Sequence, residues 1–417
     1  MEKSGKFRLT SLERNWILYD VGNSAFVLMV ATLIPIFFNA LAEAGGLSSV
    51  EYLAYWGYAS SAVTIITAVL SPILGTVADT KGFKKPIFIL CVFVGIVGCC
   101  AMGAVSAWLP FLVIFVIAKV GFSGSLVFYD SMLSDVTTPE RMDEVSSRGY
   151  AWGYIGSCVP FVVCLGLVLG AGSIGISQMT ALNLALLLTA AWWLLTTLPL
   201  LKSYKQLYYV EVEKHAVRQS FARIGHTLRH LPEDKQVFWF LLAFFCYIDG
   251  VYTIIDMATA YGTALDLDTT GLLLALLVTQ IVAFPSALVF GRLSNKYPSA
   301  KLIPVCIAAY AGIAVFAFFL TQQWQFWVLA VIVGMFQGGV QALSRSHFAK
   351  IIPPEKSGEY FGLFDICGKG ASFLGTMIVS VGSQLTGSAN VGVGSLIVLF
   401  IVGFVLFRVS CRQGETA

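Results

Sequence analysis

The sequence predicts an all-α membrane protein with twelve transmembrane helices arranged as two pseudo-symmetric six-helix bundles. Hydrophobic residues make up 57% of the 417 positions and charged residues only 12%, whereas about a quarter of the residues in soluble domains are charged. Twelve apolar stretches are each long enough to cross a bilayer, which takes about 20 residues. A short basic turn also occurs twice, half a chain apart, and indicates an internal duplication.

The twelve predicted spans are separated by short connections, except in the middle of the chain. They cover residues 15–41, 52–78, 86–106, 109–133, 147–170, 178–201, 236–262, 268–291, 301–321, 324–348, 357–384 and 390–409. Because the long polar break follows the sixth span, we expect a first bundle over 1–201, a cytoplasmic linker over 202–235 and a second bundle over 236–417. The first span lacks the features of a removable leader, so we expect it to stay as an anchor.

The distribution of basic residues predicts the orientation of the helices. With both termini in the cytoplasm, all but two of the 26 Lys and Arg residues fall in cytoplasmic segments or near the cytoplasmic ends of the predicted spans. The exceptions, Lys119 and Lys369, fall in the interior of predicted spans. Cytoplasmic loops of membrane proteins are enriched in basic residues, so we expect a multi-pass protein with both termini cytoplasmic. The same asymmetry explains the net charge of +3 without a nucleic-acid partner.

The linker carries a helical pattern of apolar residues. Val217, Phe221, Ile224, Leu228 and Leu231 recur at alternating steps of four and three. This spacing predicts an amphipathic helix that lies on the inner membrane surface. A solvated helix that only tethers the two bundles remains the alternative.

The repeated basic turn is the clearest motif. Residues 75–86 join the second and third spans, with Gly82 at a tight turn and Asp79 where the preceding helix ends. Residues 291–301 repeat the pattern, with Asn295 in the place of Asp79. A turn this short makes the flanking helices antiparallel. Its recurrence after about 216 residues predicts that the two bundles share one architecture.

Gly75, Asp79, Gly82, Lys84 and Lys85 resemble the cytoplasmic signature between helices two and three of the major facilitator superfamily. The whole chain is similar to one branch, the vacuolar effluxer-like (autophagy-related) permeases. The further segments that carry this resemblance are residues 19–26, 139–141, 148–156, 354–356 and 362–375. The resemblance implies the major facilitator fold and a secondary transporter. Fungal members are implicated in moving amino acids out of the vacuole, and the compact chain points to a prokaryotic member in the plasma membrane.

Polar side chains inside the spans mark the candidate sites, because a charge at the bilayer centre costs about 2.5–3.5 kcal/mol. The resemblance implies that spans 1, 4, 7 and 10 line the cavity. Candidates for substrate binding and coupling are Asp20, Asn23, Lys119, Asp249, Gln337 and Gln341. Candidates for gating are Asp79, Asp130, Arg345, Asp365 and Lys369. A structural ion pair is the alternative for each charge, above all for Asp365 and Lys369, which lie one helical turn apart.

Two of the gating candidates have specific expected partners. The resemblance places Asp79 against the start of the eleventh span, near Ser357, where free helix amides favour a carboxylate. Aligning the repeats at 139–141 and 354–356 makes Asp130 equivalent to Arg345. We therefore expect an ion pair between the bundles that closes the inner gate, and contact with headgroups or water is the alternative.

Asp249 and Lys119 both fall near the middle of the bilayer. We expect Asp249 to carry a coupling proton, and Lys119 either to balance its charge or to bind substrate. Enzyme activity is not expected, since residues 362–370 lack the Ser or Thr of a phosphate-binding loop and lie within a span. No metal or other cofactor is expected apart from a proton gradient.

These observations predict a monomeric secondary transporter that moves a small organic solute, such as an amino acid, across the lipid bilayer by alternating access. Two alternatives remain. A lipid or lysolipid transporter would need an open lateral path between spans 2 and 11 or 5 and 8. A sensor would bind the solute without moving it.

Overall fold

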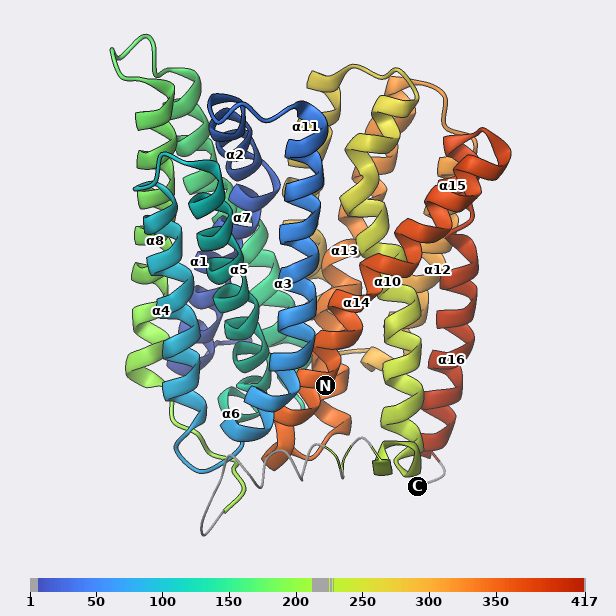
Figure 1. Ribbon diagram of the computed structural model, residues 1–417. Helices are drawn as coiled ribbons and strands as arrows, with labels where there is room; N and C mark the ends of the chain where they lie inside the picture. Colours follow the sequence, from blue (N-terminus) through green and yellow to red (C-terminus); the bar gives the residue numbers. More distant parts are fainter. Residues whose placement is uncertain (1–6, 212–224, 226, 228, 416–417) are drawn as a thin grey trace.

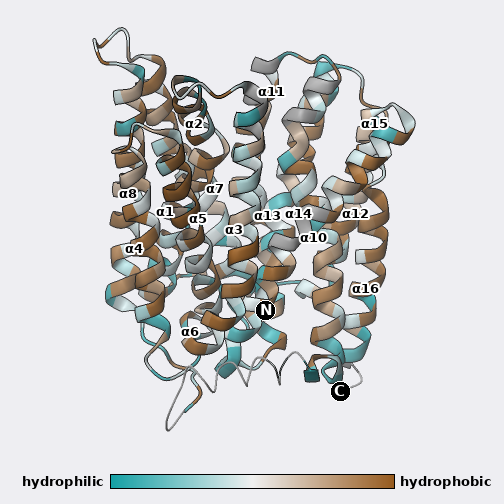
Figure 2. Cartoon of the chain, in the orientation of Figure 1, coloured by the Kyte–Doolittle hydropathy of each residue, from teal (hydrophilic) through white to brown (hydrophobic). Residues whose placement is uncertain are grey.

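The computed structural model describes residues 7–211, 225, 227 and 229–415. Two groups of helices stand side by side, and the first helix, α1 (Ser11–Ala31), begins at the end of the molecule where the last helix, α16 (Ile397–Glu415), ends (Figure 1). We call this the inner end; it also holds the turn at residues 79–83 and is the end expected to face the cytoplasm. Hydrophobic residues follow the helices along their length, and hydrophilic residues gather at the turns of the inner end (Figure 2).

The first bundle contains six membrane-spanning units. Its helices are α1 (Ser11–Ala31), α2 (Leu33–Ala44), α3 (Ser49–Ala78), α4 (Lys84–Met102), α5 (Trp108–Ser131), α6 (Leu133–Val136), α7 (Met142–Leu169) and α8 (Gln178–Ser203). The first span consists of α1 and α2 together, and α6 is a single turn that extends the fourth span. The turn from α3 to α4 has Gly82 at φ +80°, a conformation that glycine adopts without a steric penalty.

The second bundle repeats this order. Its helices are α10 (Lys235–Ala264), α11 (Thr269–Leu293), α12 (Ser299–Phe318), α13 (Gln323–Ile351), α14 (Ser357–Thr386), α15 (Ala389–Gly394) and α16 (Ile397–Glu415), with short 3₁₀ turns η1 (Leu231–Glu233) and η2 (Pro354–Lys356). Eleven units among the described residues are long and apolar enough to cross a membrane, and the 30-residue α14 makes the twelfth. The prediction of twelve spans is therefore confirmed.

Two of the spans are broken, although the sequence predicted continuous helices. The first is interrupted at Thr32, whose backbone leaves the helical region at φ −132° and ψ −76°. Pro35 explains the break, because its ring lacks an N–H and crowds the carbonyl of the residue four positions earlier. The last span is interrupted between Gly394 and Ile397, next to two glycines that weaken helix formation.

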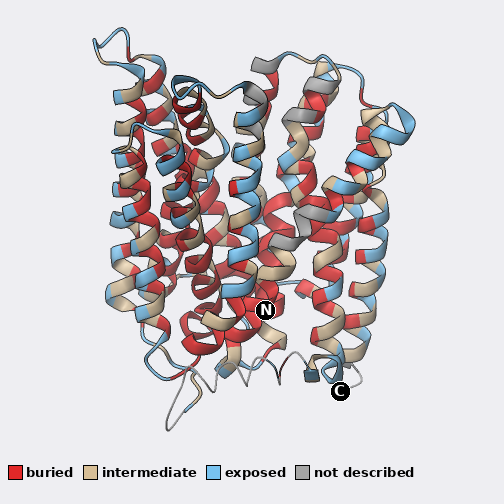
Figure 3. Cartoon of the chain, viewed as in Figure 1, coloured by how far each residue is buried: buried red, intermediate tan, exposed pale blue. Residues whose placement is uncertain are grey.

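Buried residues lie on the helix faces turned towards other helices, and exposed residues lie on the outward faces (Figure 3). Many exposed residues are large and apolar, including Phe93 at 62% and Leu195 at 65% exposure. In a soluble protein such patches would mark interaction sites. On these twelve spans they form the surface that meets lipid.

Candidate functional site

Arg345 of α13 joins the two bundles at the inner end. It is 2% exposed, and its Nη1 donates to Oδ1 of Asp130 on α5 at 3.0 Å. Its Nε donates to Oγ of Ser146 at 2.9 Å, and its Nη2 to the Ser146 carbonyl at 3.0 Å. Nη1 also lies 3.8 Å from Oδ2 of Asp20 on α1. The ion pair predicted between Asp130 and Arg345 is present.

Aromatic rings of the first bundle enclose this guanidinium. Its central carbon lies 4.3 Å from the ring centroid of Tyr150, 4.7 Å from Trp16 and 5.4 Å from Tyr129. Rings at such distances attract a cation through their negative faces. A Cβ at Gly149 would lie 3.1 Å from both Arg345 Nη2 and Asp20 Oδ2, so glycine lets α7 approach this cluster closely.

Asp79 forms a second contact between the bundles. Its Oδ1 accepts the N–H of Gly358 at 2.7 Å and its Oδ2 accepts the N–H of Glu359 at 2.8 Å. These amides belong to the first turn of α14, where N–H groups have no partner within the helix. The predicted contact of Asp79 is therefore present. Burial raises the pKa of Asp79 to about 7, although the Lys84 ammonium and the two amides act in the opposite direction.

Close backbone packing requires glycine beside Asp79. A Cβ added at Gly75 would lie 2.1 Å from the carbonyl oxygen of Gly358. A Cβ at Gly362 would lie 2.6 Å from Cα of Pro72. Both positions join α3 to α14, so this lateral contact between the bundles is tight at the inner end.

The second copy of the turn makes the equivalent contact with the donor and the acceptor exchanged between turn and helix. Nδ2 of Asn295, after α11, donates to Oε2 of Glu144 on α7 at 2.7 Å. The other oxygen of Glu144 accepts Arg148 at 2.5 Å. In the first copy the carboxylate lies on the turn and the donors on the helix start. In the second copy the donor lies on the turn and the carboxylate on the helix start.

Asp143 adds a contact that the sequence reasoning missed. Its Oδ2 lies 2.6 Å from Nζ of Lys350, and its Oδ1 accepts the hydroxyl of Ser346 at 2.6 Å. Asp143 lies at the start of α7 and its two partners on the last turns of α13. The signal available in the sequence was the pair of acidic residues in the first turn of α7.

Asp135 of α6 connects the linker to the gate, and the sequence reasoning missed it as well. It is 3% exposed. Its Oδ1 accepts the backbone N–H groups of Leu207 and Tyr208, both at 2.9 Å, and its Oδ2 accepts the Tyr204 hydroxyl at 2.5 Å. Burial raises the pKa of Tyr204, and the Asp135 carboxylate raises it further. The phenol is therefore a stable hydrogen-bond donor.

Lys84 links Asp135 to the Asp79 contact. Its fully buried Nζ lies 3.4 Å from Oδ2 of Asp135 and 3.9 Å from Oδ1 of Asp79, and it donates to Oγ of Ser357 at 2.9 Å. The linker segment 204–211, which we call the strap, also pairs with the turn: Val210 N–H donates to the Asp79 carbonyl at 2.8 Å. The sequence held one signal for Asp135. The alignment that equates Asp130 with Arg345 also equates Asp135 with the basic residue Lys350.

We predict that Asp135→Ala releases the strap from the gate. The change leaves the Tyr204 hydroxyl and two amides without their acceptor. Only the hydroxyl is buried, and leaving it unpaired costs about 1–3 kcal/mol. Hydrogen exchange at Leu207 and Tyr208 should accelerate at least about tenfold. Glu211→Gln is the matched control, because the ion pair that Glu211 makes with Lys81 in the described structure, at 3.4 Å, is exposed and weak. Unchanged exchange in Asp135→Ala would contradict the assignment.

Asp249 and Lys119 contact different partners. Asp249 is fully buried; its oxygens accept the Gly375 N–H of α14 at 2.9 and 3.0 Å and the Thr253 hydroxyl at 3.3 Å. Lys119 is half-buried, with its Nζ 4.7 Å from the ring centroid of Phe122. The described contacts of Asp249 are thus with neutral groups, and the expected charge balance by Lys119 is not among them.

The remaining candidates have varied surroundings. Gln341 accepts the Tyr154 hydroxyl at 2.9 Å and so joins α13 to α7. Asp365 accepts the Ser71 hydroxyl at 2.7 Å, which makes it a contact between the bundles. Asn23 is buried in α1, and Gln337 lines a pocket of the second bundle. The side chain of Lys369 and most of the predicted linker helix, residues 212–224, 226 and 228, lie outside the described residues.

Two six-helix bundles joined by polar contacts at one end are the architecture of a membrane transporter, and solved transporter structures superpose on it. The human organic anion transporter MFSD10 superposes with a TM-score of 0.72 at 15% identity, over 95% of this chain and 99% of that one. The major facilitator superfamily transporter FucP, in its outward conformation, gives 0.70 at 16% identity, over 96% and 97%. The fold is that of the major facilitator superfamily.

The sequence matches the family described as "Vacuole effluxer Atg22 like" over residues 11–141 and 134–416. The chain belongs to this family, and it is a multi-pass secondary transporter. It is 42% identical to the uncharacterized MFS-type transporter YxiO of Bacillus subtilis (strain 168) over 414 residues, 98% of this chain and 97% of that protein. It is 25% identical to autophagy-related protein 22 of Coccidioides immitis over 315 residues, which cover 65% of this chain and 51% of the fungal protein.

Proposed function

We propose that this transporter moves a small organic solute by alternating access, and that the structure represents its outward-facing state. The observation that carries the proposal is the position of Arg345. This cation of the second bundle is buried among Asp130, Asp20 and Ser146 of the first. Separating one partner from a buried pair costs about 3–5 kcal/mol, so the contact can hold the inner end closed until water and substrate compensate for its loss.

An amino acid is the first solute class that we propose. Lys119 supports it, because this half-buried ammonium offers a charge for a substrate carboxylate. Lys119 lies on the same face of α5 as Asp130, eleven residues and about 16 Å away along the helix axis. The family description as an effluxer supports export, and the bacterial relative supports a plasma-membrane location. We also propose that the unit is a monomer.

We also propose proton coupling at Asp249. The Gly375 amide and the Thr253 hydroxyl donate to this carboxylate. A Cβ at Gly375 would lie 2.1 Å from the Thr253 hydroxyl, so the Gly375–Asp249 hydrogen bonds depend on close packing of α10 against α14. Protonation of Asp249 would weaken these bonds and so loosen that packing.

Asp249→Asn should therefore abolish the response of transport to a pH gradient and leave solute exchange largely intact. A thermal-shift screen of amino acids, sugars, nucleosides and lysolipids identifies the solute. Counterflow and gradient-driven uptake in proteoliposomes then separate exchange from coupling. Asp256→Asn is the matched control, because Asp256 lies seven residues along the same helix and is exposed. If Asp249→Asn still concentrates the solute as the parent does, the coupling site is elsewhere.

The two alternatives give different results in the same vesicles. A lipid transporter would move labelled lysolipid, yet α3 and α14 are tightly packed at the inner end and Gly291 of α11 would place a Cβ 2.9 Å from Ser147 of α7. Both lateral paths are therefore narrow at that end. A sensor would bind solute and show no counterflow.

A further inference from the structure

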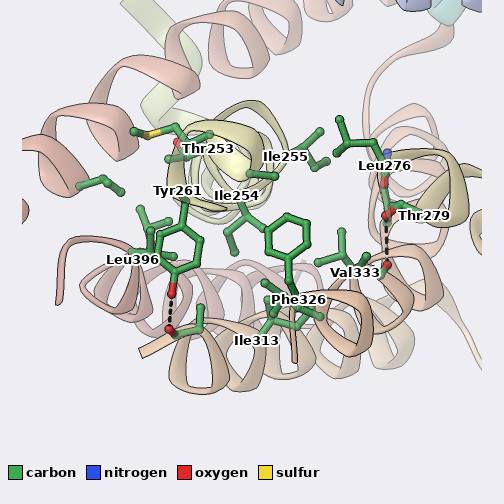
Figure 4. A pocket seen from close by; sticks show the side chains of 18 of the residues that line it. Thr253, Ile254, Ile255, Tyr261, Leu276, Thr279, Ile313, Phe326, Val333 and Leu396 are labelled. Carbon is green, nitrogen blue, oxygen red and sulfur yellow. Dashed lines mark hydrogen bonds between the residues drawn. The ribbon is translucent and has the colours of Figure 1, made fainter. Parts of the chain in front are cut away.

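A pocket inside the second bundle contains none of the gate residues. Its lining residues lie between Thr253 and Leu396. Side chains of α10, α11, α12 and α13 surround it together with Leu396, as seen in Figure 4. Val379 of α14 and Val393 of α15 also line it. The pocket belongs to a single bundle, whereas the proposed solute path runs between the two.

The lining of this pocket is apolar and uncharged. None of the described residues that form it is Asp, Glu, Lys, Arg or His. Its hydroxyl groups are directed into the protein: Tyr261 donates to the Ala317 carbonyl at 2.5 Å, and Thr279 donates to the Ala275 carbonyl at 3.0 Å. The hydroxyl of Thr253 donates to Asp249 at 3.3 Å. The polar groups left to meet a ligand are the amides of two glutamines, Gln280 and Gln337.

Gln337 points to the chemistry of the ligand. Its side chain is 5% exposed, and its Oε1 is a buried acceptor without a hydrogen-bond partner in the described structure. An unpaired buried acceptor is destabilising, and a donor on a bound molecule would restore its hydrogen bond. A molecule with a charge would gain no counter-ion here and would lose its hydration.

We propose that this pocket binds an uncharged, largely apolar molecule that donates one hydrogen bond to Oε1 of Gln337. This goes beyond the proposed transport function, because the pocket suits a different class of ligand from the charged solute expected at Lys119. Gln337 and Arg345 lie eight residues apart on α13. The ligand therefore binds to the same helix that carries the gate.

Three probes of similar shape test the proposal on the full-length protein in nanodiscs. Indole is neutral and has one N–H donor, N-methylindole lacks the donor, and indole-3-acetate carries a charge. Binding of the radiolabelled probes is measured against empty nanodiscs. We expect indole to bind about tenfold more tightly than either analogue, since one recovered hydrogen bond is worth about 1.4 kcal/mol.

Gln337→Leu should reduce the affinity for indole to that for N-methylindole. Gln178→Leu is the matched control, because Gln178 is exposed at the start of α8 in the other bundle, and it should leave indole binding unchanged. Ala258→Phe fills the pocket from α10 and should abolish binding of both neutral probes, which keeps the proposal testable if Gln337→Leu does not fold.

Equal affinity for indole and N-methylindole in the parent protein would overturn the proposed donor. Undiminished indole binding in Ala258→Phe would overturn the pocket itself. Both outcomes are independent of solute transport, so they are distinguishable from a failure of the Asp249 experiment.

Discussion

Arg345→Ala is expected to open the inner end and to destabilise the closed state by about 3–5 kcal/mol, because it leaves Asp130 and Asp20 buried without their cation. The change also removes the guanidinium from the rings of Tyr150 and Trp16. Hydrogen exchange should rise in peptides covering the start of α7 and the end of α13. Arg292→Ala is the control, since Arg292 is an exposed cation at the same end.

Exchanging the two charges provides the stricter test. Arg345→Asp and Asp130→Arg should each open the inner end, and the double variant should close it in part. Full restoration is not expected, because the carboxylate introduced on α13 would lie near Asp20. The aromatic rings that attract the Arg345 guanidinium would not attract a carboxylate. Near-parental hydrogen exchange in both single variants would mean that each charge is solvated without its partner. The ion pair would then not act as a gate.

Acidification is expected to favour the closed inner end through Asp79. The pKa of Asp79 in the closed state is about 7, above the ordinary 3.8, because burial disfavours its charge. In an open, solvated state the pKa would return towards the ordinary value. The closed state therefore takes up a proton that the open state does not hold between about pH 4 and 7, and the closed-to-open ratio should change by up to about tenfold per pH unit. The stabilisation of the closed state is complete below about pH 4, decreases as the pH rises and is lost above about pH 7.

The amides of Gly358 and Glu359 report this equilibrium directly. After correction for the intrinsic pH dependence of exchange, they should be better protected at pH 5.5 than at pH 8. Asp79→Asn should remove that difference. It should also leave the amides less protected than in the parent at pH 5.5, because the NH₂ group of the carboxamide would face one of the two amides and cannot accept a hydrogen bond.

The control for this experiment is another aspartate that caps a helix. Oδ2 of Asp268 accepts the Gly271 amide at 2.6 Å at the start of α11, away from the inner end. Asp268→Asn should affect Gly271 and leave Gly358 and Glu359 unchanged. A pH response that survives in Asp79→Asn would assign the proton to another group.

Part of the gate was predictable, because the internal duplication allows the two halves of the sequence to be aligned and equivalent residues to be identified. The repeat at 139–141 and 354–356 aligned Asp130 with Arg345, and the two residues are in contact. The resemblance of residues 75–86 to a known signature placed Asp79 at the start of α14, where it accepts two amides. In both cases the information was in the spacing of motifs along the chain.

The sequence by itself determined the number of spans, the two-bundle division and the apolar outer surface, because bilayer thickness sets the length and composition of each helix. Only the tertiary structure decided the partners of side chains within that frame. Asp249 turns towards Gly375 of α14, and Asp135 holds the strap at 204–211 through backbone amides. Hydropathy and helical period describe one helix at a time, whereas a buried carboxylate is stabilised by whichever donors the neighbouring helices bring within about 3 Å.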